Sequence, residues 1–279
     1  MDSTKELRQK LQAFKYEGRE RPWGYRALQR GPSIYITRFA IKHDLTPNQI
    51  TLAGIICGII GSFLVFFALP FKIAGAILLY ANILSDKVDG ETARFRIQEK
   101  RGKVYLRGVY LDELNHLIIP PLFLLGVTLG IISNFPYNTS ILAFTGLFAT
   151  LSLPFLRVYH SLAPQIFMKK YIKHPELFSP LPHANEPDPI FQIKKKYSPL
   201  KKFIQAIHQL QDFFIIVFLL FLSFLGEITM PMFRPHLLSG LLVVILGIIL
   251  PLIVIENSIK GFFQIEHRVR DIKDKYWQK

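Results

Sequence analysis

Six apolar runs recur along the chain, and they constrain the possible folds more than any other feature of the sequence. They lie at about 51–69, 73–88, 109–131, 141–158, 204–226 and 237–256. A helix needs about 20 apolar residues to cross the hydrocarbon of a bilayer, where backbone groups find hydrogen-bond partners only within the protein. The runs therefore predict an all-α integral membrane protein with six transmembrane helices, and they argue against a soluble globule.

Basic residues occur almost entirely in alternate connections between these runs. Of the 34 Lys and Arg residues, only Lys72 and Arg234 fall in the other set of segments. Because cytoplasmic loops carry the excess of Lys and Arg in membrane proteins, this distribution predicts that both termini are cytoplasmic. The formal net charge of +14 follows mostly from this topology and from attraction to anionic headgroups, so it is weak support for nucleic-acid binding.

The segments around the apolar runs divide the chain into three predicted parts. Residues 1–31 form a basic cytoplasmic segment, residues 32–260 form the six-helix domain, and residues 261–279 form a basic cytoplasmic tail. Residues 32–44 mix apolar and charged side chains in a pattern typical of an amphipathic helix on the membrane surface. Residues 160–203 are a long cytoplasmic connection with a proline-rich stretch and a basic run.

Acidic residues stand at the predicted cytoplasmic end of the second apolar run, in the stretch SDKVDGETAR. Asp86 and Asp89 are three residues apart and so share a helix face. Carboxylates are costly near hydrocarbon, which favours a functional role for both. Gly90 and Ala93 follow on nearly the same face, where small side chains permit close approach of a ligand or a helix. Arg94 adds a guanidinium whose fork geometry suits phosphate.

The third apolar run opens with GVYLDELNH, in which Asp112 and His116 are four residues apart on one helix face. Two helices thus each present a pair of possible metal ligands at the same membrane depth. Clustered carboxylates repel one another unless cations lie between them, and hard oxygen ligands suit Mg²⁺ or Mn²⁺. On the same side of the membrane, Asn48 and Thr51 share a face of the first transmembrane helix, which Thr46 is predicted to cap.

Together the two stretches resemble the signature of the CDP-alcohol phosphotransferases (CDP-alcohol phosphatidyltransferases), DxxDGxxAR followed by GxxxDxxxD. DxxDGxxAR at a helix end is a highly specific motif. TPNQIT at the start of the first span, the six spans and the preceding surface helix also resemble the family. The resemblance covers roughly residues 32–260. The matching signature positions are Asp86, Asp89, Gly90, Ala93, Arg94, Gly108 and Asp112.

The sequence departs from the signature at two places. Thirteen residues separate Arg94 from Gly108, more than the family usually has, so we expect a short insertion in the cytoplasmic loop. The last Asp of the signature is replaced by His116. In the family this Asp is the proposed general base and also helps to bind metal. By position, the base would therefore be His116, whose neutral imidazole can accept a proton near neutral pH.

Two alternatives to His116 as the base stay open. Glu113 is a rival, but adjacent side chains on a helix point about 100° apart, so Glu113 cannot share the face of Asp112 as His116 does. His116 is also interpretable as a structural, hydrogen-bonding histidine in an enzyme whose substrate needs little help from a base.

Other polar residues near helix ends have weaker assignments. Arg157 either binds an acceptor phosphate or extends to headgroups, and Asp212 is predicted to be a boundary or helix-pairing residue.

The resemblance implies a multi-pass membrane transferase whose active site faces the cytoplasm. It would move a substituted, phosphatidyl-type phosphate group from a CDP-alcohol to a hydroxyl acceptor with release of CMP, in phospholipid or related lipid biosynthesis. The expected partners are donor, acceptor, membrane lipids and a second copy of the chain in a homodimer, without nucleic acid. Two Mg²⁺ or Mn²⁺ ions would bind. The implied metal ligands are Asp86, Asp89, Asp112 and His116, the catalytic residues are Asp112 and His116, and the nucleotide contacts are Gly90, Ala93, Arg94, Asn48 and Thr51.

Two other functions remain open at this point. A divergent, non-catalytic relative that binds nucleotide or lipid would account for the altered last position of the signature. A small membrane transporter would account for six spans, although transporters more often place charged residues or broken helices near the membrane midplane. The sequence does not identify the donor alcohol or the acceptor.

Overall fold

The computed structural model describes residues 3–12, 24–99, 106–134, 139–173, 206–229 and 236–276. Most of the predicted 160–203 connection lies outside the described residues. So do parts of the predicted insertion, of the N-terminal segment and of the C-terminal tail.

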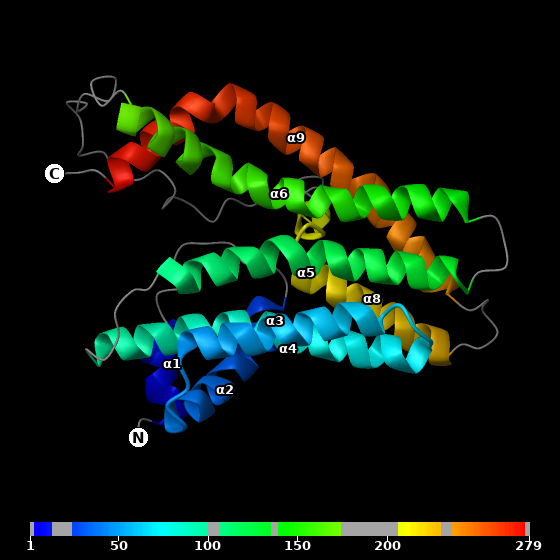
Figure 1. The fold of residues 1–279 in the computed structure, drawn as a ribbon, viewed down its shortest axis with the longest axis horizontal. Helices are drawn as coiled ribbons and strands as arrows, with labels where there is room; N and C mark the ends of the chain where they lie inside the picture. The colour runs from blue at the N-terminus through cyan, green and yellow to red at the C-terminus, as the bar shows by residue number, and fades with distance from the viewer. Residues whose placement is uncertain are drawn as a thin grey trace.

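All regular elements in the described ranges are helical, which confirms the predicted all-α class (Figure 1). They are α1 (Thr4–Gln12), the π-helix η2 (Tyr25–Arg30), α2 (Gly31–Lys42), α3 (Pro47–Leu64), α4 (Leu69–Gln98), α5 (Leu106–Ile132), α6 (Ser140–Lys173), α8 (Phe213–Thr229) and α9 (Leu237–Tyr276).

Five of these helices, α3, α4, α5, α6 and α9, contain segments that are long and apolar enough to cross a membrane. The sixth apolar helix, α8, has 17 residues, about 26 Å at 1.5 Å per residue. The hydrocarbon core is about 30 Å thick. Helix α8 is thus shorter than this thickness. The predicted span at 204–226 is also wrong at its start, because residues 210–212 form a turn and a bend and the helix begins at Phe213. The chain is a multi-pass membrane protein, while six spans and cytoplasmic termini stay predictions.

Three helices continue beyond the predicted ends of their apolar runs. Helix α4 extends to Gln98, so the whole SDKVDGETAR stretch is helical, as the spacing of its aspartates requires. Helix α6 extends to Lys173 and α9 to Tyr276. At its other end α3 begins as predicted, because Thr46 and Gln49 form a capping box and Pro47 occupies the first helical position.

The helices form a bundle in which α5 lies between the α3–α4 pair and α6, and α6 runs beside α9 (Figure 1). Helix α8 packs against α4 and α9, and α1 and α2 pack against α4. Helices α3 and α4 approach each other closely at two glycines. A Cβ atom on Gly61 would lie 2.8 Å from the backbone oxygen of Gly75, so this approach requires a residue without a side chain.

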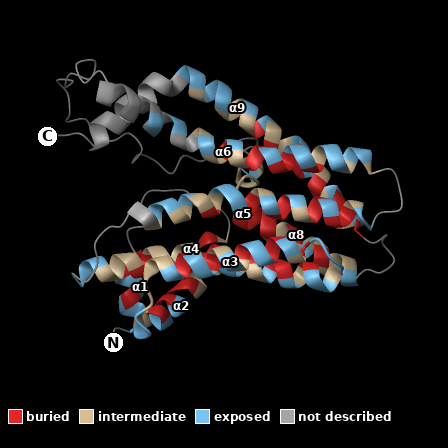
Figure 2. Cartoon of the chain, in the orientation of Figure 1, coloured by how far each residue is buried: buried red, intermediate tan, exposed pale blue. Residues whose placement is uncertain are grey.

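Buried residues gather where the helices meet, and exposed residues cover the outer faces (Figure 2). Phe123 of α5 and Phe224 of α8 are fully buried in the main core. Large apolar side chains such as Phe63, Ile141 and Phe155 are exposed on the outside of the bundle. An apolar outer surface of this extent is unfavourable in water and suits lipid, in agreement with a membrane protein.

Helix α2 coincides with the predicted surface helix at 32–44. Its buried face carries Ile34 and Thr37, while Tyr35, Ile36 and Phe39 are exposed. The exposed apolar face is suited to the membrane interface, so the amphipathic character predicted for this segment is present in the structure.

Lys72, one of the two basic residues outside the predicted cytoplasmic segments, has a packing explanation. Its side chain is fully buried, its Nζ atom lies 3.1 Å from His236 Nδ1, and His236 Nδ1 lies 3.6 Å from Glu227 Oε2. Lys72 thus belongs to a buried charge cluster that links α4, α8 and α9. Its position in the sequence reflects this cluster and does not weaken the topology argument.

Candidate metal centre and active-site cavity

Three of the predicted metal ligands come together between α4 and α5. Ligand atoms of Asp86, Asp112 and His116 all lie within 4.8 Å of one another. His116 Nε2 is 3.5 Å from Asp86 Oδ1 on the neighbouring helix and 3.4 Å from Asp112 Oδ1 on its own helix. The i, i+4 spacing on α5 therefore combines with a side chain of α4 to form a group of two carboxylates and one imidazole.

This group fits a divalent cation. Apart from the 3.4 Å contact with His116 Nε2, the buried Asp112 Oδ1 accepts no hydrogen bond from the residues that the structure describes, and a buried carboxylate oxygen without a hydrogen bond is costly. A bound cation would offset this cost. Two carboxylates suit Mg²⁺ or Mn²⁺, whereas the imidazole makes the donor set less oxygen-rich than Mg²⁺ prefers.

Asp89, the fourth predicted metal ligand, is not part of this compact group. Its Oδ2 atom accepts a 2.6 Å hydrogen bond from Thr51 Oγ1 of α3. Among the described residues, the group of possible ligands comprises Asp86, Asp112 and His116 and does not include Asp89. Thr51, which the sequence predicted as a nucleotide contact, thus donates a hydrogen bond to Asp89.

Asn82 and Asn115 hold α4 and α5 together one helical turn from the metal-ligand group. Asn82 Nδ2 donates to the backbone oxygen of Gly54 at 2.8 Å and to Asn115 Oδ1 at 2.9 Å. Both asparagine side chains are buried. This network joins α3, α4 and α5, and it explains how Asp86 is placed opposite His116.

Asn48, a predicted nucleotide contact, lies at the close approach of α3 and α5. A Cβ atom added to Gly108 would lie 2.8 Å from Asn48 Oδ1, closer than carbon and oxygen atoms can pack without displacement. A larger residue at position 108 would therefore require the Asn48 side chain to shift, so Gly108 lets this side chain lie between the two helices.

Gly90 and Arg94 lie side by side on α4. A Cβ atom on Gly90 would be 3.3 Å from Arg94 Nη1, and Arg94 Nε donates to the backbone oxygen of Leu11 at 3.2 Å. Ala93 is half-buried beside them. The guanidinium is therefore engaged by α1 of the N-terminal segment, a contact that the sequence did not predict.

Glu91 is a further residue of the signature stretch that sequence reasoning missed. Its side chain is fully buried and accepts hydrogen bonds from Arg30 Nη1 at 2.6 Å and Thr37 Oγ1 at 2.5 Å. Gln12 Nε2 and Ser33 Oγ each donate to it at 2.9 Å. Glu91 thus ties α1, η2 and α2 to α4 beside the signature aspartates. The cost of a carboxylate near hydrocarbon could have indicated a role for Glu91 from the sequence, as it did for Asp86 and Asp89.

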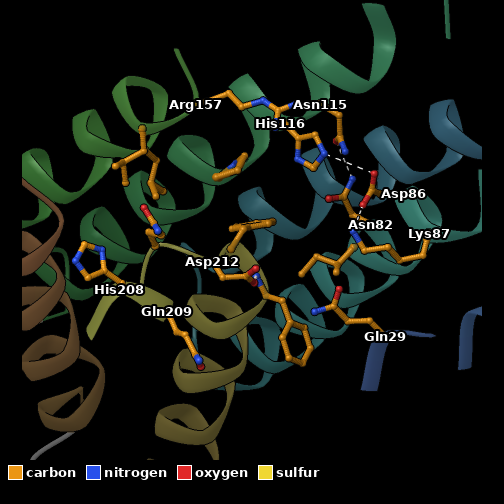
Figure 3. A pocket seen from close by; sticks show the side chains of 17 residues that line it. Gln29, Asn82, Asp86, Lys87, Asn115, His116, Arg157, His208, Gln209 and Asp212 are labelled. Carbon is orange, nitrogen blue, oxygen red and sulfur yellow. Dashed lines mark hydrogen bonds and ion pairs between the residues drawn. The ribbon is translucent and has the colours of Figure 1, made fainter. Parts of the chain in front are cut away.

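A cavity of about 500 Å³ opens beside the metal-ligand group (Figure 3). Asp86 and His116 line it together with residues from η2, α4, α5, α6 and the segment before α8. None of Gly90, Ala93, Arg94, Asn48 and Thr51 is among the described lining residues. The lining comprises Gln29, Asn82, Ile83, Asp86, Lys87, Asn115, His116, Pro120, Leu153, Leu156, Arg157, His208, Gln209, Gln211, Asp212, Phe213 and Phe214.

The basic side chains in this lining have acidic partners. Lys87 forms an ion pair with its neighbour Asp86. Arg157 Nε and Nη2 donate to the two carboxylate oxygens of Glu113 at 2.9 and 2.7 Å. Because both oxygens of Glu113 are engaged by Arg157, the geometry favours His116 over Glu113 as a proton acceptor next to the metal ligands.

Asp212 lines the cavity at the start of α8, although the sequence suggested a boundary residue. Its Oδ1 atom accepts a 3.0 Å hydrogen bond from the backbone N–H of Phe214, so Asp212 also caps the helix. Burial raises the pKa of its carboxyl above the ordinary value, and this is partly opposed by the charge of Lys87 and by backbone N–H groups. The carboxylate is thus a polar feature of a cavity wall that also contains apolar side chains.

Comparison with known proteins assigns a family to this part of the chain. Residues 44–176 match the CDP-alcohol phosphatidyltransferase family. A search of curated proteins found no match. The match includes every signature position from Asp86 to His116, which confirms the resemblance over this range. The wider domain boundaries of 32–260 and the correspondence of His116 to the last signature Asp stay predictions.

Proposed function

We propose that the CDP-alcohol phosphatidyltransferase domain at residues 44–176 is catalytic and transfers a substituted phosphate group from a CDP-alcohol to a hydroxyl acceptor. The acceptor oxygen attacks the β-phosphorus, a new oxygen–phosphorus bond forms, and the bond from that phosphorus to the bridging oxygen breaks. The bridging oxygen leaves with its electron pair on CMP, and the hydroxyl proton passes to a base. The products are a phosphodiester and CMP.

The convergence of Asp86, Asp112 and His116 beside a cavity is the observation that supports this proposal most directly. These residues would hold Mg²⁺ or Mn²⁺. When bound, such an ion offsets negative charge on a diphosphate and on its leaving group. The signature pattern adds Asp89 to this set, and the hydrogen bond from Thr51 fixes the orientation of its carboxylate.

His116 is the proposed proton acceptor. Its Nε2 atom lies near carboxylate oxygens of both Asp86 and Asp112, and these stabilise the imidazolium that forms when the proton is taken up. The side chain lines the cavity, where an acceptor hydroxyl can approach it. Because Arg157 donates to both carboxylate oxygens of Glu113, His116 is the better candidate for the base than Glu113.

Arg94, Gly90, Ala93 and Asn48 are the proposed nucleotide side of the site. Gly90 and Ala93 leave room near the backbone of α4, and the guanidinium of Arg94 offers donors to phosphate. A lipid-linked or soluble CDP-alcohol is the proposed donor, and the site is proposed to face the cytoplasm in a homodimer engaged in lipid synthesis.

Release of CMP by the purified full-length protein tests the proposal. The protein is reconstituted in lipid nanodiscs with Mg²⁺, CDP-diacylglycerol or a soluble CDP-alcohol, and a panel of hydroxyl acceptors. We expect CMP release that depends on both the acceptor and the metal. A correctly inserted protein that releases no CMP from any combination but still binds CMP would instead be a non-catalytic, nucleotide-binding relative.

A further inference from the structure

The cavity extends beyond the metal-ligand group to a second wall. Figure 3 shows Asp86 and His116 on one side, His208 and Gln209 on the other, and Asp212 between them. Asp212 and His208 come from the segment at and before the start of α8, which lies outside the matched range of 44–176. The part of the cavity that these residues line is therefore not covered by the family match.

The basic groups that line the cavity are poorly placed to hold a phosphate group, and Lys87 is paired with Asp86. Arg157 donates from Nε and Nη2 to both oxygens of Glu113, and His208 Nε2 lies 3.1 Å from Glu256 Oε2. A phosphate that bound here would compete with carboxylates already in contact with these donors. The remaining polar lining of this wall is supplied by carboxamides and by the carboxylate of Asp212.

Asp212 has a role as a helix cap, but capping does not require a charge. Asn and Ser cap helices about as well as Asp, because one side-chain oxygen is sufficient to accept the N–H of the first turn. A carboxylate that lines a cavity attracts hydroxyl and ammonium donors and repels phosphate. The choice of Asp at this position is therefore informative about the molecule that occupies this part of the cavity.

We infer that Asp212 binds the acceptor, and that the acceptor is a small hydroxyl compound without a phosphate group, a polyol or an amino alcohol whose hydroxyl or ammonium group donates to this carboxylate. The inference rests on the proposed transfer reaction. To that reaction it adds the chemical class of the acceptor and names Asp212 as a residue that determines acceptor specificity. Gln29, contributed by η2, lines the same cavity and supplies a further neutral hydrogen-bonding group.

Paired acceptors test the acceptor class. CMP release by the reconstituted protein is measured with glycerol against glycerol phosphate, inositol against inositol phosphate, and ethanolamine against phosphoethanolamine, with diacylglycerol as a lipid acceptor. We expect turnover with at least one unphosphorylated small compound, and at least tenfold higher kcat/KM for it than for its phosphorylated counterpart. Preference for a phosphorylated acceptor or for diacylglycerol would overturn the inference and leave the proposed function intact. Absence of CMP release with every acceptor would count against the proposed function itself.

Asp212→Asn tests the residue, because Asn keeps the helix cap and removes the charge. We expect the KM for the acceptor to rise at least tenfold, while the KM for the CDP-alcohol and the unfolding temperature stay close to wild type. Asp212→Ser provides a second capping variant. Asp44→Asn is the matched control, since Asp44 pairs with Arg96 at an exposed site and lies outside the cavity lining. An unchanged acceptor KM in both Asp212 variants would show that Asp212 is only a cap.

Discussion

The imidazole of His116 on α5 lies 3.5 Å from a carboxylate oxygen of Asp86 on α4. This contact links the two halves of the signature, whose residues are otherwise carried by separate helices. It places His116, which is predicted to replace the last Asp of the signature, beside the signature residue Asp86. Because His116 Nε2 also lies 3.4 Å from Asp112 Oδ1, the imidazole contacts one proposed metal ligand on each helix.

Replacement of His116 tests its role as base. His116→Ala should lower kcat by roughly 10²–10⁴, the usual scale for loss of a general base. In the wild type the rate should fall at acid pH, because imidazolium cannot accept a proton. His116→Asp supplies the Asp that we expect at this position of the signature, so it should recover part of the rate and increase the preference for Mg²⁺ over Mn²⁺. The measurement is a pH profile of CMP release for all three proteins.

Glu113→Gln is the control for that experiment. The variant loses charge at the rival base but keeps a side chain that can contact Arg157, so kcat should stay within a few-fold of wild type. A near-normal rate and an unchanged acid limb in His116→Ala, together with a large loss in Glu113→Gln, would reverse the assignment.

Removal of divalent metal should abolish turnover. The buried oxygen of Asp112, which accepts no hydrogen bond from the described residues, and the nearby Asp86 indicate a cation-binding group, so EDTA should stop CMP release and Mg²⁺ or Mn²⁺ should restore it. Asp86→Asn and Asp112→Asn should raise the metal concentration for half-maximal Mn²⁺ binding, measured by electron paramagnetic resonance. Full activity in a verified metal-free preparation would exclude the mechanism.

The buried ion pair between Arg30 and Glu91 should contribute strongly to stability. Arg30→Ala leaves Glu91 buried without its charged partner, which typically costs about 3–5 kcal/mol. Asp44→Asn weakens an exposed pair with Arg96 and should cost about 0–1 kcal/mol. Denaturant unfolding of both variants in micelles, followed by circular dichroism, measures the difference. Equal stability of the two variants would mean that the N-terminal helices are not coupled to α4.

Labelling of introduced cysteines should reveal the orientation in the membrane. In a background in which Cys57 is replaced by Ala, a cysteine at Arg101 or Asn185 should react with an impermeant maleimide only from the cytoplasmic side. One at Phe135 should react only from the opposite side. These outcomes follow from the distribution of basic residues, and reversed labelling would contradict that argument.

Relationships within one helix were predictable from the sequence. The apolar runs predicted the helical class, the spacing of Asp112 and His116 predicted their common face, and Thr46 and Pro47 predicted the start of α3. Each depends on residues within about one helical turn of one another or on a continuous run, and helix geometry relates such residues directly. The same applies to the distribution of basic residues, which requires only the order of the segments.

Relationships between helices were decided by tertiary packing. Packing placed Asp86 against His116, brought Asp89 into a hydrogen bond with Thr51, buried Glu91 beneath the N-terminal helices and brought Asp212 into the cavity wall. These residues are separated by tens of positions or more, and their proximity depends on how side chains of several helices interlock, for example at Gly61 and Gly75. A single sequence records which residues are on each helix face but not which face meets which, because that choice minimises the energy of the whole bundle.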